Sequence, residues 1–265
     1  MKKLIFFDID GTLLTEGSSH YVPDSTAQAL EMLKKNGHIC IINTGRPYSA
    51  LDNVIMSINV SGYICGCGTY IRLDNDVLLA HHLSSELCRE IIHELCACKI
   101  EWLLEGENAI YYSDKEYHTQ IKYAVDGYLK DLPDKIHCID ENDCSNVIFD
   151  KFCIAVTSES NLSRFRSHFS DKLTFIDRGN SFFEIVPNNY SKATGMKFLE
   201  EYLNIDHKNT YAVGDSSNDI PMLEYANTSI LMGNAETSLH GYADYITDSV
   251  TENGIFNAFR HFELI

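Results

Sequence analysis

Short apolar segments that stop abruptly at polar residues are the feature that most limits how this chain folds. Leu4–Phe7, Ile39–Ile42 and Thr210–Val213 are predicted strands, and helical patterns lie between them in the chain. Buried strands that alternate with helices form parallel sheets with right-handed crossovers. The sequence therefore predicts an α/β fold in which both ends of the chain contribute to one parallel sheet.

The alternation of predicted strands and helices changes near His81, which marks the start of a predicted insertion. Helical patterns there alternate with paired strand candidates, which indicates an α+β unit with a mostly antiparallel sheet. The turn-forming stretch at 187–190 marks the return to the first pattern. We expect a core at 1–80 and 187–265 and an inserted α+β cap domain at 81–186. Among the core helices, one is predicted at 49–57.

Charge and cysteine content exclude several classes of protein. The chain has 265 residues and a formal net charge of −17, so it lacks the basic surplus that binds nucleic acid or an anionic membrane. Nine cysteines without zinc-site or disulfide-framework spacing indicate buried or incidental thiols in a reducing compartment. Asp8 and Asp10 interrupt the N-terminal apolar segment too early for a signal peptide. We expect a cytoplasmic protein with neither nucleic-acid nor membrane partners.

Two carboxylates, Asp8 and Asp10, follow the first predicted strand directly. Ligands of parallel sheets bind at the carboxyl ends of the strands, so both side chains are expected in one crevice. One carboxylate can attack phosphorus, and the other can protonate a leaving oxygen and then deprotonate water. Gly11 allows a sharp turn after them. Taken alone, the motif is also compatible with a solvated acidic loop.

A second acidic motif, Gly214–Asp219, lies between a predicted strand and a helix. Magnesium prefers carboxylate oxygens together with water and phosphate oxygens, and Asp215 with Asp8 meets that requirement. Asp219 is expected to bind the metal directly or to orient a metal-bound water. An Asn- and Asp-rich helix cap is the alternative for Asn218 and Asp219.

Two smaller motifs supply groups that carboxylates lack. Thr44 and Gly45 end the second strand, where a hydroxyl and backbone N–H groups can hold phosphate oxygens. Lys192 lies at the start of a predicted helix, where the amide dipoles already favour an anion. A lysine there can neutralise the charge of an Asp8–phosphate pair.

Together these motifs resemble those of the haloacid dehalogenase-like (HAD) superfamily, and more narrowly its Cof-type phosphatases. The resemblance rests on Asp8-x-Asp10 with Leu13 and Leu14, on Thr44-Gly45-Arg46, on Ser191-Lys192 and on Gly214-Asp215-x-x-Asn218-Asp219. It spans nearly the whole chain. It implies a Rossmann-like core with an inserted α+β cap of the C2 type B class, a magnesium ion as cofactor, and a small phosphorylated metabolite as partner.

The resemblance also implies a role for each matching residue. Asp8 would be the nucleophile and a metal ligand, and Asp10 the general acid and base with its backbone carbonyl on the metal. Asp215 would ligate the metal and Asp219 would support it. The groups expected to contact the phosphoryl group are Thr44, Gly45, Lys192, Asn218 and the backbone N–H groups of Ile9 and Asp10.

Three departures from the family pattern stand out: Asn43 where alanine is frequent, Cys67-Gly68-Thr69 where Asn-Gly-Ala is frequent, and Asn189-Tyr190 where Gly-Val is frequent. None of them removes a catalytic group. The third lies at the predicted end of the cap.

The leading hypothesis is a phosphatase that forms an aspartyl-phosphate on Asp8 and acts on a sugar phosphate or a phosphorylated cofactor. A phosphomutase and a non-catalytic sensor of phosphorylated ligands on the same fold are the alternatives. The cap residues considered for selecting the leaving group are Glu105, Tyr111, Tyr112 and Glu184.

Overall fold

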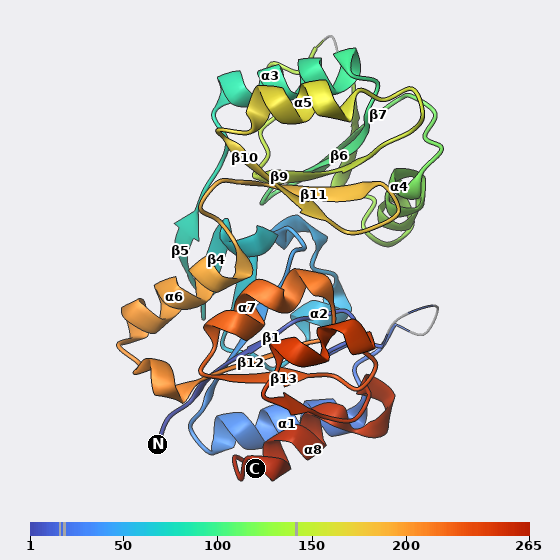
Figure 1. The fold of residues 1–265 in the computed structure, drawn as a ribbon. Coiled ribbons are helices and arrows are strands. Elements are labelled where there is room, and N and C mark those ends of the chain that lie inside the picture. Colours follow the sequence, from blue (N-terminus) through green and yellow to red (C-terminus); the bar gives the residue numbers. More distant parts are fainter. Residues whose placement is uncertain (16, 18–19, 141–142) are drawn as a thin grey trace. The chain divides into compact units, whose positions relative to one another are not determined.

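The computed structural model describes residues 1–15, 17, 20–140 and 143–265. The chain forms two compact units (Figure 1). Met1–Gly45, Asn53–Leu78 and Ser191–Ile265 make up the first, here called the core unit; Arg46–Asp52 and Leu79–Tyr190 make up the second, here called the cap unit. The expected boundaries at 80/81 and 186/187 lie within four residues of these, but residues 46–52, expected in the core, group with the cap unit.

The core unit is built on a sheet with the strand order β14-β13-β12-β1-β2-β3-β4-β5. The strands are β1 (Leu4–Phe7), β2 (Ile39–Asn43), β3 (Gly62–Cys65), β4 (Tyr70–Leu73), β5 (Asp76–Ala80), β12 (Thr210–Gly214), β13 (Thr228–Leu231) and β14 (Tyr245–Ile246). All pairings from β14 to β3 are parallel, and β4 is antiparallel to β3. Every side chain of β1 is fully buried, as expected for a central strand with helices on both faces. The predicted α/β fold is confirmed.

Helices cover this sheet on both faces. They are α1 (Asp24–Lys35), α2 (Asn53–Met56), α6 (Lys192–Leu203), α7 (Ile220–Tyr225) and α8 (Gly254–His261), with short 3-10 turns η2 (Gly66–Gly68), η3 (His207–Asn209), η4 (Ser217–Asp219), η5 (Thr237–Tyr242) and η6 (Val250–Glu252). Figure 1 shows α1 beside α8 on one face and α6 beside α7 on the other, and both pairs are in contact. The candidate residues Lys192, at the start of α6, and Asp219, just before α7, therefore belong to the α6–α7 layer.

The single helix predicted at 49–57 is wrong. The chain forms a 3-10 turn, η1 (Tyr48–Ala50), and the extended backbone of Leu51 separates it from α2. The reason is tertiary: the Ser49 hydroxyl donates a hydrogen bond to the Gly106 carbonyl at 2.7 Å, and Ala50 packs into an apolar cluster of the cap unit. These contacts hold the turn within the cap unit and interrupt the helix.

The cap unit contains a second, mostly antiparallel sheet with the order β10-β11-β9-β6-β7-β8. Its elements are α3 (Ser85–Ala97), β6 (Glu101–Glu105), β7 (Ile110–Ser113), α4 (Gln120–Asp131), β8 (Ile136–Ile139), β9 (Lys151–Ala155), α5 (Leu162–Phe169), β10 (Leu173–Asp177) and β11 (Phe182–Pro187). Successive side chains of β6 alternate between two apolar clusters: Trp102 and Leu104 pack with α3 and α5, and Leu103 packs with α4. The expected α+β character of the insertion is confirmed.

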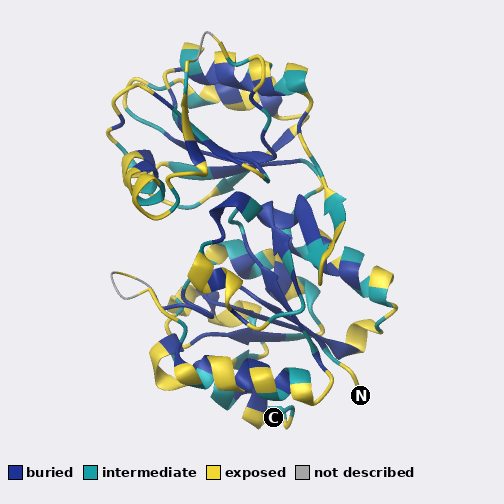
Figure 2. Ribbon diagram, turned by 180° about the vertical axis from the view of Figure 1, so that it is seen from behind, coloured by how far each residue is buried: buried dark blue, intermediate teal, exposed yellow. Residues whose placement is uncertain are grey.

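The buried residues follow the strands of both sheets, which Figure 2 shows as dark bands through each unit. All nine cysteines are free thiols, and Cys138 is the exposed one. Among the residues that the structure describes, none of the helices is both long and apolar enough to cross a bilayer.

Candidate active site

The ends of β1 and β12 bring the two acidic motifs together. These strands pair in parallel with Phe7 opposite Val213, and the backbone N–H of Asp8 donates to the Val213 carbonyl at 3.0 Å. Asp8 and Asp215 therefore leave the sheet at the same edge. This is where ligands of parallel sheets bind.

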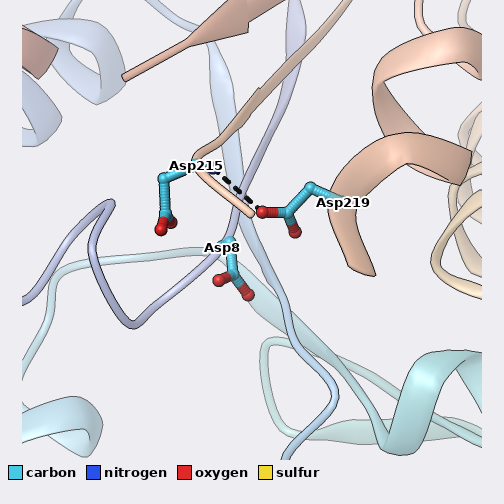
Figure 3. Close-up of side chains that lie close together, drawn as sticks. All are labelled: Asp8, Asp215 and Asp219. Atoms are coloured by element: carbon cyan, nitrogen blue, oxygen red, sulfur yellow. Dashed lines mark hydrogen bonds between the residues drawn. The ribbon is translucent and has the colours of Figure 1, made fainter. Parts of the chain in front are cut away.

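Asp8, Asp215 and Asp219 form a cluster in which one carboxylate oxygen from each lies within 4.8 Å of the others. Figure 3 shows the three side chains approaching one another from the ends of β1 and β12 and from the turn before α7. Their exposed fractions are 5%, 7% and 0%, respectively. Three carboxylates so close together in a buried place repel one another, so the cluster requires positive charge nearby.

Part of that charge comes from Lys192, the first residue of α6. Its Nζ donates to Asp8 Oδ1 at 2.6 Å and to Asp219 Oδ1 at 2.5 Å. Burial alone would lower the pKa of Lys192, but Asp219 and Asp8 outweigh it and hold the pKa above its ordinary value. Lys192 is therefore a fixed ammonium group shared by two carboxylates.

One ammonium group does not neutralise three carboxylates, and the pKa of Asp8 shows the remaining excess of negative charge. Burial, and then the negative charges of Asp219 and Asp10, raise the pKa of Asp8 from 3.8 to about 7, although Lys192 opposes the shift. A carboxyl group in this state gains from any further cation placed beside it. The electrostatics thus favour a divalent metal ion at this position.

Asp219 has both of its oxygens engaged within the protein. Its Oδ1 accepts from Lys192, and its Oδ2 accepts from the backbone N–H groups of Asp215 at 2.9 Å and Ser216 at 3.0 Å. Gly214 makes room for it, because a Cβ on that glycine would lie 2.6 Å from the Asp219 side chain. The carboxylate of Asp219 therefore orients Lys192 and the loop that carries Asp215.

The loop after β1 holds Asp215 from the other side. The Thr12 hydroxyl donates to Asp215 Oδ1 at 2.7 Å, and both groups are buried. Gly11 has φ +78°, and a Cβ there would lie 2.4 Å from Asp215 Oδ2. Only glycine combines that conformation with such a close approach. The Asn234 amide donates to the Gly11 carbonyl at 2.9 Å and fixes this turn.

Local sequence explains why α6 begins at Lys192. Ser191 has an extended backbone, and its hydroxyl accepts from the N–H of Thr194 at 3.2 Å, while Thr194 Oγ1 accepts from the N–H of Ser191 at 2.9 Å. This reciprocal capping box ends the extended backbone at Ser191 and starts the helix at the next residue. The lysine is thus placed at the first position of the helix.

The remaining predicted residues lie around this cluster. Asp10 is partly exposed and acts on Asp8 through its charge. Thr44 is buried after β2; its N–H donates to the Ile64 carbonyl, and its carbonyl accepts from the N–H of Cys67. The side chain of Asn218 accepts from the Ser216 hydroxyl at 2.5 Å.

Ile9 and Gly45 enter the site through their backbones. Ile9 is buried, and its carbonyl accepts the N–H groups of Leu13 and Leu14 at 2.9 Å, which closes the turn after β1. Gly45 follows Thr44 and is partly exposed. Both residues thus belong to loops that leave the strand ends next to Asp8.

Two residues of this site have no role in the sequence-based prediction. Thr12 is within the first motif, so its hydroxyl beside acidic residues was a usable signal. Asn43 donates from Nδ2 to the carbonyl of Lys192 at 3.1 Å. Its only signal in the sequence is a polar residue at the end of an apolar strand, where alanine is frequent in the family.

The residues present fit a magnesium ion. Their oxygen donors are hard, anionic and clustered, which are the properties that magnesium selects. Asp8 and Asp215 are the carboxylates suited to direct contact, since Asp219 is already occupied by Lys192 and two N–H groups.

The four residues considered for selecting the leaving group lie at different places within the cap unit. Glu105 and Glu184 both contact Lys151, whose Nζ lies 2.5 Å from Glu105 Oε2 and 2.7 Å from Glu184 Oε1. Tyr112 packs against the apolar cluster on the α4 side of the sheet, while Tyr111 packs against the α3–α5 side. The two tyrosines thus face opposite sides of the cap sheet.

Comparison with known proteins identifies the family. The family model of the haloacid dehalogenase-like hydrolases matches residues 5–259. Phosphatase YwpJ of Bacillus subtilis is 26% identical over 98% of this chain and 99% of its own length. The 5-amino-6-(5-phospho-D-ribitylamino)uracil phosphatase YitU of the same organism is 24% identical over 95% and 94%.

A solved structure extends the likeness to three dimensions. The HAD subclass IIB sugar phosphatase BT4131 superposes with a TM-score of 0.82, at 24% identity, over 99% of this chain and 100% of that one. This confirms the expected fold, a HAD core with an inserted cap. The chain belongs to the haloacid dehalogenase-like hydrolase family.

Proposed function

We propose that this chain hydrolyses a small phosphorylated metabolite with the help of Mg²⁺, by forming an aspartyl-phosphate on Asp8. The observation that carries the proposal is the environment of Asp8: buried, in contact with the Lys192 ammonium, and clustered with Asp215 and Asp219. A structural ion pair would not require two further carboxylates beside it. A nucleophile that attacks an anionic phosphate needs the surplus of positive charge that a metal and a lysine supply.

In the proposed site, Asp8, Asp215 and the backbone carbonyl of Asp10 hold the metal, and Asp219 supports them. When bound, magnesium neutralises charge on the phosphoryl oxygens and helps to align the ester with its attacker. Thr12 keeps one oxygen of Asp215 in a fixed direction through its hydrogen bond.

The chain's own groups account for both half-reactions. In the first, an oxygen of Asp8 bonds to phosphorus while the bond from phosphorus to the ester oxygen breaks, and Asp10 gives its proton to that leaving oxygen. In the second, Asp10 takes a proton from water, whose oxygen attacks phosphorus and displaces the Asp8 carboxylate. Inorganic phosphate is released and Asp10 is protonated again.

Lys192 stays protonated through both steps, because Asp8 and Asp219 hold its pKa high. Its charge therefore serves to stabilise the phosphoryl oxygens and not to transfer a proton. We assign further contacts to these oxygens to the Thr44 hydroxyl, the Asn218 side chain, and the backbone N–H groups of Ile9, Asp10 and Gly45.

The names of two relatives support a substrate class. YitU is named for a phosphorylated ribitylaminouracil, and BT4131 for sugar phosphates. We propose a substrate of this kind, a small polyhydroxylated phosphate monoester or a phosphorylated cofactor.

A phosphatase assay over a panel of sugar phosphates and phosphorylated cofactors, with and without Mg²⁺, tests the proposal. We expect phosphate release that requires magnesium and is abolished in Asp8→Asn. Asp24→Asn, an exposed aspartate at the start of α1, is the matched control and should retain full activity. Full activity of Asp8→Asn would contradict the aspartyl-phosphate mechanism. Transfer of the phosphoryl group to another sugar hydroxyl would identify a mutase, and ligand binding without turnover a sensor.

A further inference from the structure

Asn43 is a buried polar residue that touches the backbone of Lys192. It is the last residue of β2, has no exposed surface, and directly precedes Thr44. Its Nδ2 donates to the Lys192 carbonyl at 3.1 Å and lies 3.6 Å from the sulfur of Met222 in α7. The amide thus joins the end of β2 to the first residue of α6.

Burial of the Asn43 side chain also lowers the stability of the protein. Asn43 Oδ1 is buried and, within the described part of the chain, has no hydrogen-bond partner. A buried unsatisfied acceptor lowers stability, and an apolar side chain of the same shape would avoid the loss. A fully buried residue that costs stability and touches the backbone of Lys192 calls for a functional reason.

The start of α6 is held on its other side by close packing. A Cβ on Gly68 would lie 2.5 Å from the Ser191 carbonyl oxygen, and a Cβ on Gly195 would lie 2.6 Å from Ile64 Cγ2. These contacts fix the first turn of the helix against β3 and η2. The Asn43 amide adds a hydrogen bond from the same turn to the end of β2, the strand next to β1.

We infer that Asn43 is a positioning residue for Lys192. Its Nδ2 holds the Lys192 carbonyl against the end of β2, so that the Lys192 ammonium stays between Asp8 and Asp219. Asn43 acts through the backbone of Lys192 and through no contact of its own with the substrate. The inference rests on the proposed function, because it assigns Lys192 to the phosphoryl-transfer step.

Two variants separate the hydrogen bond from packing. Asn43→Val replaces the amide with an apolar side chain of similar volume, and Asn43→Ala removes the amide and most of the volume. Steady-state kinetics with p-nitrophenyl phosphate and Mg²⁺ should show kcat lower by about ten-fold in both variants with KM little changed, since small misplacements of a catalytic group act on the transition state. The melting temperature of Asn43→Val should equal or exceed that of the wild type, because the variant buries no unsatisfied acceptor.

Thr247→Val is the matched control. Thr247 is buried in the core unit, and its hydroxyl donates to the Gly254 carbonyl at 2.7 Å, a bond of the same kind away from the site. Its loss should lower the melting temperature and leave kcat unchanged. Wild-type kcat in both Asn43 variants, or a fall in kcat that only follows a fall in melting temperature, overturns the inference.

A binding measurement distinguishes failure of the Asn43 inference from failure of the proposed function. Orthovanadate, which mimics the phosphoryl group in transfer, should bind the Asn43 variants about ten-fold more weakly than the wild type, while inorganic phosphate binds almost equally. If the wild type binds vanadate but releases no phosphate from any substrate, the proposed function fails. Equal vanadate affinity in wild type and variants rejects the role of Asn43 alone.

Discussion

Lys192 Nζ lies 2.6 Å from Asp8 Oδ1, and the two residues are 184 positions apart in the chain. Neither side chain is more than 7% exposed. A salt bridge in such a place owes its strength to the absence of competing water, and it leaves a costly charge behind when one partner is removed. The pair therefore couples the chemistry of the site to the stability of the core unit.

Replacing Lys192 by methionine should lower kcat by about 10³-fold, because a fixed charge aimed at the transferring group contributes about 4 kcal/mol to the transition state. The same change leaves Asp8 and Asp219 without their ammonium partner, so the free energy of unfolding should fall by about 3 kcal/mol or more. Steady-state kinetics and urea denaturation measure the two effects. Lys197→Met, an exposed position on the same helix, is the control. A kcat within ten-fold of the wild type would contradict the assigned role.

The raised pKa of Asp8 predicts a pH effect on stability in the absence of metal ions. Its pKa is 3.8 ordinarily and about 7 in the folded protein, so the folded state binds this proton more tightly than the unfolded chain. The resulting stabilisation is fully present below about pH 4 and is lost as the pH rises through 7.

Chemical denaturation of wild type and Asp8→Asn in EDTA tests this effect, because groups that do not interact with Asp8 titrate alike in both proteins. The free energy of unfolding of the wild type, minus that of the variant, should fall between pH 4 and pH 7. A difference that stays flat or rises over this window would show that burial does not raise the pKa of Asp8.

Thr12→Val should weaken magnesium activation. Valine keeps the shape of threonine but cannot donate to Asp215, and the loss of a partner behind a metal ligand typically weakens metal binding 10- to 100-fold. We expect the magnesium concentration for half-maximal activity to rise by about that factor, with a smaller change in kcat at saturating metal. The hydrogen bond is irrelevant to the metal if the magnesium dependence of the variant matches that of the wild type.

Cys67 adopts φ 54° between two glycines that also have positive φ. Non-glycine side chains other than Asn and Asp rarely adopt this left-handed region, and the conformation costs roughly 1 kcal/mol. Cys65 and Cys67 are both buried, so an asparagine at either position carries the cost of a buried amide, but only at position 67 does it relieve the strained backbone. Urea denaturation should therefore give Cys67→Asn a free energy of unfolding about 1 kcal/mol higher than that of Cys65→Asn. Equal values in the two variants would contradict this account.

Lys151 in the cap unit is 2% exposed and lies between Glu105 and Glu184. Lys151→Met leaves two buried carboxylates unneutralised and should lower the free energy of unfolding by about 3–5 kcal/mol. The triple change Lys151→Met, Glu105→Gln, Glu184→Gln should recover much of that loss. Lys122→Met removes an exposed i,i+4 pair with Asp126 and should change stability by less than about 1 kcal/mol. Equal effects at the two lysines would contradict this account.

Much of the architecture could be predicted because it depends on local patterns. The apolar segment of β1, the helical spacing in α1 and the capping residues before α6 each specify their element within a few positions. The strand β5 (Asp76–Ala80) carries no such pattern, because its residues are exposed or partly exposed and form no buried apolar face.

The candidate residues of the site were also predictable, since each follows a strand or begins a helix. Their contacts were not. The segment 46–52 continues directly from Gly45, yet it belongs to the cap unit because Ser49 and Ala50 find partners there. No periodicity within seven residues can report which distant backbone carbonyl a serine will reach.

By itself, the sequence determined the α/β class, the inserted cap and the carboxylates placed at strand ends, because these depend on hydrophobic periodicity and on turn and cap residues. Only the tertiary structure decided that Lys192 bridges Asp8 and Asp219, that Thr12 holds Asp215, and that Asn43 reaches the backbone of Lys192. The physical reason is that these bonds join residues far apart in the chain. Strand order and helix packing set their geometry, and both arise only when the whole core unit is formed.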